Sequence, residues 1–275
     1  MMALVFIYGA MPTASTALAE EKPSVVSMNL CTDQLVLLLA DPDQILSLSY
    51  LAHDERTSVY YDQALGYPTN RGLAEEVYIL KPDLIVTGIY SNWVASSMLE
   101  KLGLPVMRFD PAYQLDDIRT NILEMGRLLG QTDRAEALVA AFDKRLAAIK
   151  INEKVKPRAA LYEANGYTSG SLSLAHHIIE AAGFHNIGGE FGTSYGARLS
   201  PEALLMKVPD IIILSRPGRG YARAEEVTRH PALDHLKEAA PIEAVTTKDW
   251  VCDTPRILDA IEALANLRPS FDQQP

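Results

Sequence analysis

Residues 74–87 read Ala-Glu-Glu-Val-Tyr-Ile-Leu-Lys-Pro-Asp-Leu-Ile-Val-Thr, and this stretch decides the fold class. Its first half has apolar side chains at helical spacing, Lys81-Pro82-Asp83 supplies a stop, and residues 84–87 form a short apolar run typical of a buried strand. A related phrase, Lys-Val-Pro-Asp-Ile-Ile-Ile, stands at 207–213. Because a Pro-Asp pair commonly ends a helix before a strand, both phrases predict a helix followed directly by a strand.

The segments around residues 74–87 repeat this alternation. Short runs rich in Val, Leu and Ile read as strands, and the amphipathic stretches between them read as helices. The expected strands are 25–29, 45–49, 84–87 and 106–109, and the expected helices are 32–40, 74–80 and 93–102. Strands that alternate with helices indicate parallel βαβ units, so the first half of the chain is predicted to form an α/β lobe.

A longer helical pattern follows this lobe. It runs from residue 115 to about 151 with a break at 130–133, and its second half carries one apolar stripe, which we interpret as a connector helix lying across two lobes. The alternation then returns. The expected strands are 159–162, 211–214 and 244–246, and the expected helices are 174–182, 201–207 and 256–267.

The predicted fold is therefore an α/β protein of two lobes, each a mainly parallel sheet flanked by helices, joined by one long connector helix. The predicted boundaries are 20–130 for the N-terminal lobe, 131–156 for the connector helix and 157–275 for the C-terminal lobe. Residues 1–19 hold an apolar run that ends in Ala17-Leu18-Ala19, and this pattern predicts a signal peptide and an exported protein.

Composition and charge narrow the function classes. The chain has 275 residues with a formal net charge of −10, and we see no basic stripe, which argues against a nucleic-acid binder. Beyond the leader no run of about 18 apolar residues is present, so we expect no direct insertion into a membrane. Export would allow Cys31 and Cys252 to form one bridge, and two buried free thiols are the alternative that the sequence leaves open.

Aromatic side chains follow many of the predicted strands, at the edge where open α/β sheets bind ligands. Aromatic rings in loops can stack on a flat or rounded organic ligand while their polar tips make hydrogen bonds. Arg198 is the preferred cationic candidate over Arg71. The predicted ligand-binding residues are Tyr50, Tyr90, Trp93, Tyr113, Tyr167, Tyr195, Arg198 and Trp250.

Metal-binding and catalytic patterns are weak in this sequence. The six histidines, His53, His176, His177, His185, His230 and His235, lack the spacing of a metal site, so no metal ligands and no intrinsic cofactor are predicted. His53 is retained as an axial contact for a haem or corrinoid metal. We find no nucleophile elbow, P-loop, H-E-x-x-H or C-x-x-C motif, and we therefore expect a binding protein and not an enzyme.

Several phrases, in this order, carry a resemblance to a known family. They are Val25-Val26-Ser27-Met28-Asn29 with Thr32-Asp33, the block at 74–84, Tyr167-Thr168-Ser169-Gly170, Leu199-Ser200-Pro201-Glu202 before Pro209-Asp210, and Asp249-Trp250 before Thr254-Pro255-Arg256. Over essentially the whole mature chain, the sequence resembles the periplasmic substrate-binding proteins of the siderophore and cobalamin ABC importers. The last phrase resembles the cobalamin-binding members in particular.

This resemblance implies a monomeric receptor that captures a metal chelate between two lobes and delivers it to an ABC permease dimer with its ATPase subunits. It also implies one permease-docking glutamate per lobe, at Glu75 and Glu202. The cargo is expected to carry iron or cobalt. Catecholate, hydroxamate, corrinoid and haem cargoes remain open, and a receptor for haem or for free zinc or manganese is the alternative.

Overall fold

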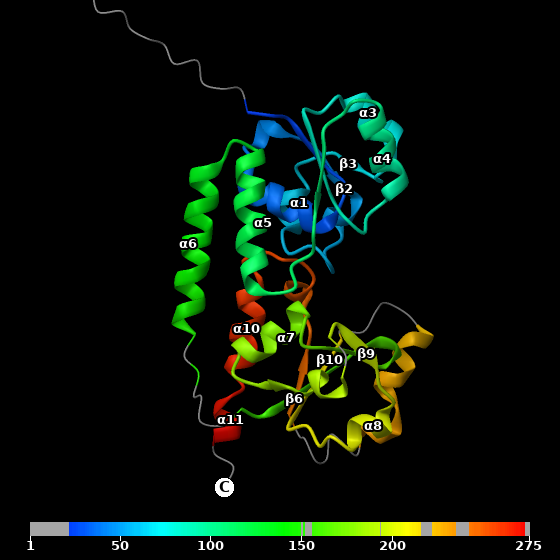
Figure 1. Cartoon of the computed structure of the whole chain (residues 1–275), viewed down its shortest axis with the longest axis vertical. Coiled ribbons are helices and arrows are strands. Elements are labelled where there is room, and N and C mark those ends of the chain that lie inside the picture. The colour runs from blue at the N-terminus through cyan, green and yellow to red at the C-terminus, as the bar shows by residue number, and fades with distance from the viewer. Residues whose placement is uncertain are drawn as a thin grey trace, which may run out of the picture.

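The computed structural model describes residues 22–149, 151, 156–192, 194–215, 222–234 and 242–272. The predicted signal peptide at 1–19 and His235 lie outside these residues. The described chain forms two α/β lobes, with a pair of long helices along one side (Figure 1). None of the helices in these ranges has the length and hydrophobicity needed to cross a bilayer.

The N-terminal lobe is built on a five-stranded parallel sheet with the strand order β3-β2-β1-β4-β5. Its strands are β1 Val25–Ser27, β2 Ile45–Ser49, β3 Thr69–Asn70, β4 Leu84–Gly88 and β5 Val106–Phe109. Its helices are α1 Leu30–Leu39, α2 Tyr61–Ala64, α3 Ala74–Leu80 and α4 Trp93–Lys101. The predicted first strand ends two residues early because the side chain of Asn29 caps α1, accepting hydrogen bonds from the amides of Cys31 and Thr32.

Alternate residues of each strand face opposite layers of helices. In β1, Val25 belongs to the same apolar cluster as the buried side chains of α1, whereas Val26 packs with the cluster under α3 and α4. The C-terminal lobe repeats this arrangement, with Leu161 and Ile213 in the first cluster and Ile212 in a separate one with Leu204. Because the first cluster contains residues of both lobes, one continuous apolar core joins them.

The C-terminal lobe contains a four-stranded parallel sheet with the order β11-β10-β6-β8. Its strands are β6 Arg158–Tyr162, β8 His185–Asn186, β10 Ile211–Leu214 and β11 Ile242–Val245. A short antiparallel pair, β7 Tyr167–Ser169 with β9 Gly196–Arg198, was not predicted. The helices are α7 Leu174–Ala181, α8 Pro201–Leu205, α10 Ile257–Ala265 and α11 Pro269–Asp272.

The long helical pattern forms two helices, α5 Leu115–Leu128 and α6 Thr132–Ala148, which lie side by side (Figure 1). They approach closely at Gly126, where an added Cβ would collide with the Cβ of Ala135. Near its end α6 reaches the other lobe, because Arg145 forms ion pairs with Asp259 and Glu262 of α10. The connector helix is therefore α6, which ends at Ala148 within the predicted 131–156 segment.

The two related Pro-Asp phrases form the same turn in both lobes. Lys81 after α3 and Val208 after α8 adopt the left-handed conformation, with φ of 48° and 47°. In each case the aspartate two residues later accepts a hydrogen bond from a residue at or directly before the start of the neighbouring strand, β1 in the N-terminal lobe and β6 in the C-terminal lobe. Asp83 accepts from the Ser24 amide at 2.9 Å and from its hydroxyl at 2.6 Å, and Asp210 accepts from the Arg158 amide at 2.7 Å. The hydrogen bonds from Ser24 lower the pKa of Asp83.

Candidate ligand-binding cleft

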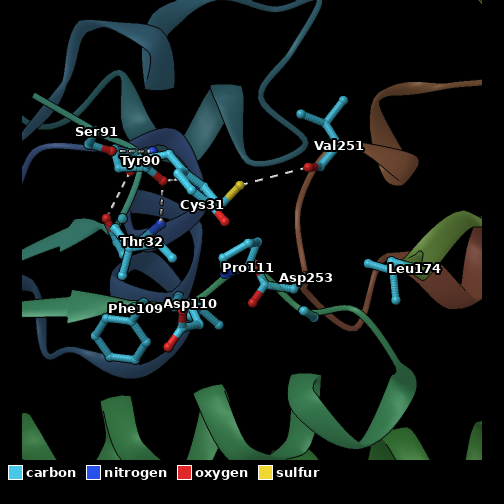
Figure 2. A pocket seen from close by; sticks show the side chains of 15 residues that line it. Cys31, Thr32, Tyr90, Ser91, Phe109, Asp110, Pro111, Leu174, Val251 and Asp253 are labelled. Carbon is cyan, nitrogen blue, oxygen red and sulfur yellow. Dashed lines mark hydrogen bonds between the residues drawn. The ribbon is translucent and has the colours of Figure 1, made fainter. Parts of the chain in front are cut away.

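A cavity of about 200 Å³ lies between the lobes. Most of its lining comes from the segments that follow β1, β4 and β5, which end at the same edge of the N-terminal sheet. The C-terminal lobe contributes Leu174, at the start of α7, together with Val251 and Asp253 (Figure 2). Its position at the carboxyl ends of parallel strands is where open α/β sheets bind ligands.

Hydrogen bonds hold the polar side chains at the start of α1 in place. The side-chain oxygen of Asn29 accepts from the Cys31 amide at 2.9 Å, and its amide nitrogen donates to the Ser91 hydroxyl at 2.9 Å. The Thr32 hydroxyl donates to the Asn29 carbonyl at 3.0 Å. This part of the wall is therefore fixed by local structure before any ligand arrives.

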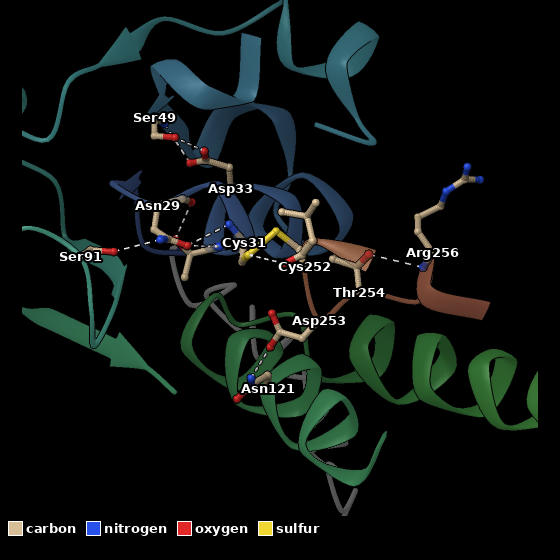
Figure 3. Close-up of a disulfide and its surroundings, with 12 residues drawn as sticks. Asn29, Cys31, Asp33, Ser49, Ser91, Asn121, Cys252, Asp253, Thr254 and Arg256 are labelled. Carbon is tan, nitrogen blue, oxygen red and sulfur yellow. Dashed lines mark hydrogen bonds between the residues drawn. A yellow bond between two sulfur atoms is a disulfide. The ribbon is translucent and has the colours of Figure 1, made fainter. Parts of the chain in front are cut away.

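A disulfide joins Cys31, in the first turn of α1, to Cys252, in the loop that precedes α10 (Figure 3). The two Cα atoms are 5.1 Å apart, and 221 residues separate the two positions in the sequence. The structure thus contains the bridge and not the pair of free thiols. Because the two cysteines belong to different lobes, the bridge ties the lobes together beside the cavity.

A second contact between the lobes lies next to this bridge. The buried carboxylate of Asp253 accepts a hydrogen bond from the side-chain amide of Asn121 on α5 (Figure 3). The same Asn121 amide group donates to the Asp110 carbonyl at 3.0 Å. Burial raises the pKa of Asp253, although the bond from Asn121 works in the opposite direction. Asn121 therefore positions an acidic group of one lobe against the cavity wall of the other.

A second hollow, of about 310 Å³, opens on the other side of Val251. It is lined from the N-terminal lobe by Asp54, Arg56 and Thr57, and from the C-terminal lobe by residues that include Lys248. The ammonium group of Lys248 donates to the Glu55 carbonyl at 3.2 Å, which adds another polar contact between the lobes. Val251 is 52% exposed and lines both hollows, so it forms a ridge between them.

Three of the predicted ligand-binding residues gather across the lobes. Tyr90 lines the cavity, and its hydroxyl lies 3.2 Å from the hydroxyl of Tyr113. The ring of Tyr113 meets the ring of Tyr195, from the C-terminal lobe, edge to face at 5.7 Å between centroids. The hydrogen bond with Tyr90 is the main cause that raises the pKa of Tyr113 to about 12. We call these three residues the tyrosine cluster.

Tyr90 is the one predicted residue that lines this cavity, and the remaining five lie outside the tyrosine cluster. Tyr50 is 56% exposed, and the ring of Trp93 lies 4.5 Å from the guanidinium of Arg108. Trp250 packs partly buried against the core. Tyr167 and Arg198 are paired across β7 and β9, and both are exposed. Their roles as ligand contacts stay predictions.

Metal ligation finds no support in the part of the chain that the structure describes. No group of three or more His, Cys, Asp and Glu side chains there could hold an ion. His53 packs on α2, with a ring nitrogen 2.9 Å from the Ala64 carbonyl. Its proposed axial contact to a metal in the cargo therefore stays a hypothesis.

Our sequence analysis missed the acidic residues of the cavity, Asp110 and Asp253, and the amide of Asn121 that positions one of them. A signal was present for Asp110, which directly follows a predicted strand, but we searched those positions for aromatic residues. Asp253 stands next to Cys252, and only the pairing of that cysteine with Cys31 places it at the cleft.

Both predicted docking glutamates are exposed and lie in the first turn of a short helix, Glu75 in α3 and Glu202 in α8. Each stands six residues before the left-handed residue of the repeated turn, Lys81 or Val208. They therefore occupy equivalent positions in the two lobes. Hydrogen bonds from its own backbone amide and from Ser200 lower the pKa of Glu202, so this carboxyl stays ionised at neutral pH.

Comparison with known proteins agrees with this architecture. A curated cobalamin-binding protein of Halobacterium salinarum is 26% identical over 261 residues, covering 90% of this chain and 70% of that protein. Two solved structures share the fold. The periplasmic heme-binding protein RhuT of Roseiflexus sp. RS-1 has a TM-score of 0.73 at 17% identity and covers 92% of this chain and all of its own. The periplasmic vitamin B12 binding protein BtuF of Vibrio cholerae has a TM-score of 0.66 at 18% identity and covers 91% and 98%.

The family model for periplasmic binding proteins matches residues 25–246, which include the N-terminal sheet, the connector helix and the C-terminal sheet. These matches are to binding proteins and not to enzymes. The two-lobed fold, the cavity between the lobes and this match lead to one conclusion: the chain belongs to the periplasmic binding protein family.

Proposed function

We propose that the protein is the periplasmic receptor of an ABC importer, and that it captures a metal chelate of siderophore or corrinoid type between its lobes. The observation that carries the proposal is the cavity at the carboxyl ends of β1, β4 and β5, which the C-terminal lobe closes with Leu174, Val251 and Asp253. The iron or cobalt belongs to the cargo. The cobalamin-binding relative supports this class of cargo.

The dimensions of the cleft fit a ligand that enters in part. Pockets for drug-sized ligands usually have volumes of roughly 300–1,000 Å³. A cavity of about 200 Å³ therefore accepts one edge of a bulky chelate. The rest would lie against the tyrosine cluster, whose members Tyr90 and Tyr195 are 79% and 60% exposed. Aromatic rings with hydroxyl tips can both stack on such a ligand and hydrogen-bond its polar groups.

The test is a titration of tryptophan fluorescence in the mature protein with cyanocobalamin, haem, a ferric catecholate, a ferric hydroxamate and free zinc. Saturable quenching by one chelate at sub-micromolar concentration is expected, after correction for absorption by the coloured ligands. The Tyr90→Ala variant should weaken this binding, whereas Glu136→Gln, an exposed change on α6, should not. A response to zinc alone would replace the proposal with a free metal-ion receptor.

Delivery to a permease dimer would use Glu75 and Glu202. Their equivalent positions on the two lobes suit a partner that is itself two-fold symmetric. Each glutamate is followed by exposed apolar side chains, Ile79 after Glu75 and Met206 after Glu202, which are 75% and 84% exposed. Each carboxylate could pair with a basic group on the permease and so fix the orientation of the docked protein. Burial of the neighbouring apolar side chain would add affinity.

Charge reversal separates docking from capture. The double variant Glu75→Lys with Glu202→Lys should lose import by the intact transporter and should keep the chelate affinity of the unchanged protein. Glu136→Lys with Asp62→Lys is the control for added positive charge, because both residues are exposed and lie outside α3 and α8. Import by the double variant at the unchanged rate would refute the docking assignment and leave the capture proposal in place.

A further inference from the structure

The polar groups of the cavity can be accounted for one by one. The side-chain amide of Asn29 uses its oxygen to cap α1 and its nitrogen to bond Ser91. The Thr32 hydroxyl is occupied by Ser27 and by the Asn29 carbonyl. These groups have little capacity left for a ligand, because their bonds also fix the start of the helix.

The Ser91 hydroxyl accepts the bond from Asn29, and the Tyr90 hydroxyl is hydrogen-bonded to Tyr113. The charged groups of the lining are two carboxylates, Asp110 and Asp253. The Asp110 side chain is exposed and has no hydrogen bond or ion pair to any described residue. Asp253 is 7% exposed, and Asn121 engages one of its two oxygens. Among the described lining residues there is no Lys, Arg or His. A carboxylate accepts hydrogen bonds and donates none, so the charged groups of this cavity are acceptors, beside the hydroxyls of Tyr90 and Ser91, which can also donate.

The charged groups that an adjoining hollow adds are already engaged. This hollow shares Phe109, Asp110 and Pro111 with the cavity and adds Asp117, which accepts hydrogen bonds from the Tyr113 and Gln114 amides, and Glu124, which is ion-paired with Arg127. Its described cation, Arg108, is already paired with Glu100 and stacked over Trp93. Arg56 and Lys248 line the hollow on the other side of the Val251 ridge.

We infer that this cavity selects its cargo by charge and by hydrogen-bond donors, with Asp110 and Asp253 as the selecting groups. The part of the cargo that enters is uncharged or cationic and carries N–H donors, such as primary amides or an ammonium group, on an apolar frame that fits Leu35, Ile89 and Leu174. A polyanionic chelate would bring negative charge against these two carboxylates, and the described lining offers no cation to pair with it. This inference rests on the proposed function and narrows its cargo class.

Matched ligands test the inference by isothermal titration calorimetry on the intact, oxidised protein at pH 7.5. Cyanocobalamin is compared with its monocarboxylic acid derivative, in which one side-chain amide is a carboxylate, and cationic ferrioxamine B with trianionic ferric enterobactin. We expect the tightest binding from a neutral or cationic chelate. The affinity should fall by about tenfold or more for the ligand of each pair that carries negative charge in place of a hydrogen-bond donor.

Two variants test the residues. Asp110→Asn and Asp253→Asn each supply an amide that can donate, so the preference for the neutral or cationic ligand should shrink to about threefold or less. Glu136→Gln removes the same charge from α6 and should leave the preference unchanged. Because Asp253 is buried, unfolding of each variant is followed in parallel, and the exposed Asp110 keeps the test valid if Asp253→Asn fails to fold.

The outcomes separate this inference from the proposal on which it rests. Ferric enterobactin binding as tightly as cyanocobalamin or ferrioxamine B, or tighter, would overturn the inference and leave the chelate receptor standing. Unchanged selectivity in both aspartate variants would overturn the assignment to Asp110 and Asp253. Failure of every chelate to bind would overturn the receptor proposal and the inference together.

Discussion

The two lobes share one plan and differ in what they give to the cleft. Each places a helix, a left-handed residue, a Pro-Asp pair and a buried strand in succession, so that Glu75 and Asp83 of one lobe match Glu202 and Asp210 of the other. The cavity, however, is walled mostly by the N-terminal lobe, and the C-terminal lobe adds three residues. The turn is therefore common to both lobes, whereas the cavity is lined by loops at the opposite edge of the sheets, mostly those of the N-terminal lobe.

The largest effect is expected where the lobes are joined. Replacing both Cys31 and Cys252 by Ala should lower the free energy of unfolding by about 2–5 kcal/mol, because the bridge restrains the unfolded chain. Urea unfolding with and without reductant measures this loss. Reductant should destabilise the unchanged protein and have no effect on the variant. Equal stability of the two proteins without reductant would mean that the bridge does not stabilise the assembly of the lobes.

A buried acid in the N-terminal lobe gives the next largest effect. Burial raises the pKa of Asp33 to about 7, although hydrogen bonds from Ser27 and Ser49 oppose the shift. Between pH 3.8 and about 7 the folded state then binds more protons than the unfolded state, so stability is lost as the pH rises through this window. The slope is at most about 1.4 kcal/mol per pH unit.

The variant Asp33→Asn keeps a side-chain oxygen for the Ser49 amide and cannot titrate. Its free energy of unfolding, measured in urea from pH 4 to pH 8, should therefore lack this decline. The unchanged protein and Glu136→Gln should both show it. A decline of the same size in Asp33→Asn would assign the titration to another group.

The repeated turn permits a comparison at a smaller scale. Asp83→Ala removes an acceptor of two hydrogen bonds from Ser24, and Asp210→Ala removes an acceptor of one from Arg158. Each should cost about 1 kcal/mol of stability, with the larger loss for Asp83→Ala. The pH dependence gives a further check. At a pH below the lowered pKa of Asp83, this carboxyl is protonated in the unchanged protein, so the stability lost in Asp83→Ala should approach the loss in Asp210→Ala. A larger loss for Asp210→Ala would show that the turns are not equivalent in energy.

The smallest effect concerns the left-handed residue of the turn. Val208 is β-branched and Lys81 is not, yet both have a positive φ. Val208→Gly should stabilise the fold by about 0.5 kcal/mol, because glycine removes strain of about 1–2 kcal/mol and loses more entropy on folding. Lys81→Gly should change stability less. Thermal unfolding of the two variants measures this difference, and a loss of stability in Val208→Gly would contradict it.

Local pattern was sufficient for much of the fold. The strands at 45–49, 106–109 and 211–214 were predicted with the observed limits, because Val, Leu and Ile runs between turn residues specify buried parallel strands. The helix at 74–80 and the break between α5 and α6 were also predicted. The antiparallel pair β7 and β9 was missed, since its short polar strands have no apolar alternation and pair through long-range contacts.

The cleft was less accessible to prediction than the fold. The structure brings Tyr90, Tyr113 and Tyr195 together, whereas Trp93, predicted from the same class of position, stacks with Arg108, and the ligand-binding roles of all four stay predictions. Sequence gives the order of residues along a strand end and not the direction of each side chain. The disulfide partner and the placement of Asp253 both depend on how two distant loops meet, which no local pattern encodes.

The bridge between Cys31 and Cys252 also makes most of the chain a closed covalent ring. Strands β2 to β11 and the connector helix lie within that ring, whereas β1 belongs to the segment before Cys31, and α10 and α11 belong to the segment after Cys252. A single cut by a protease anywhere between the two cysteines would open the ring without releasing a fragment. The two pieces of a nicked chain would therefore stay joined through the bridge until a reductant cleaved it.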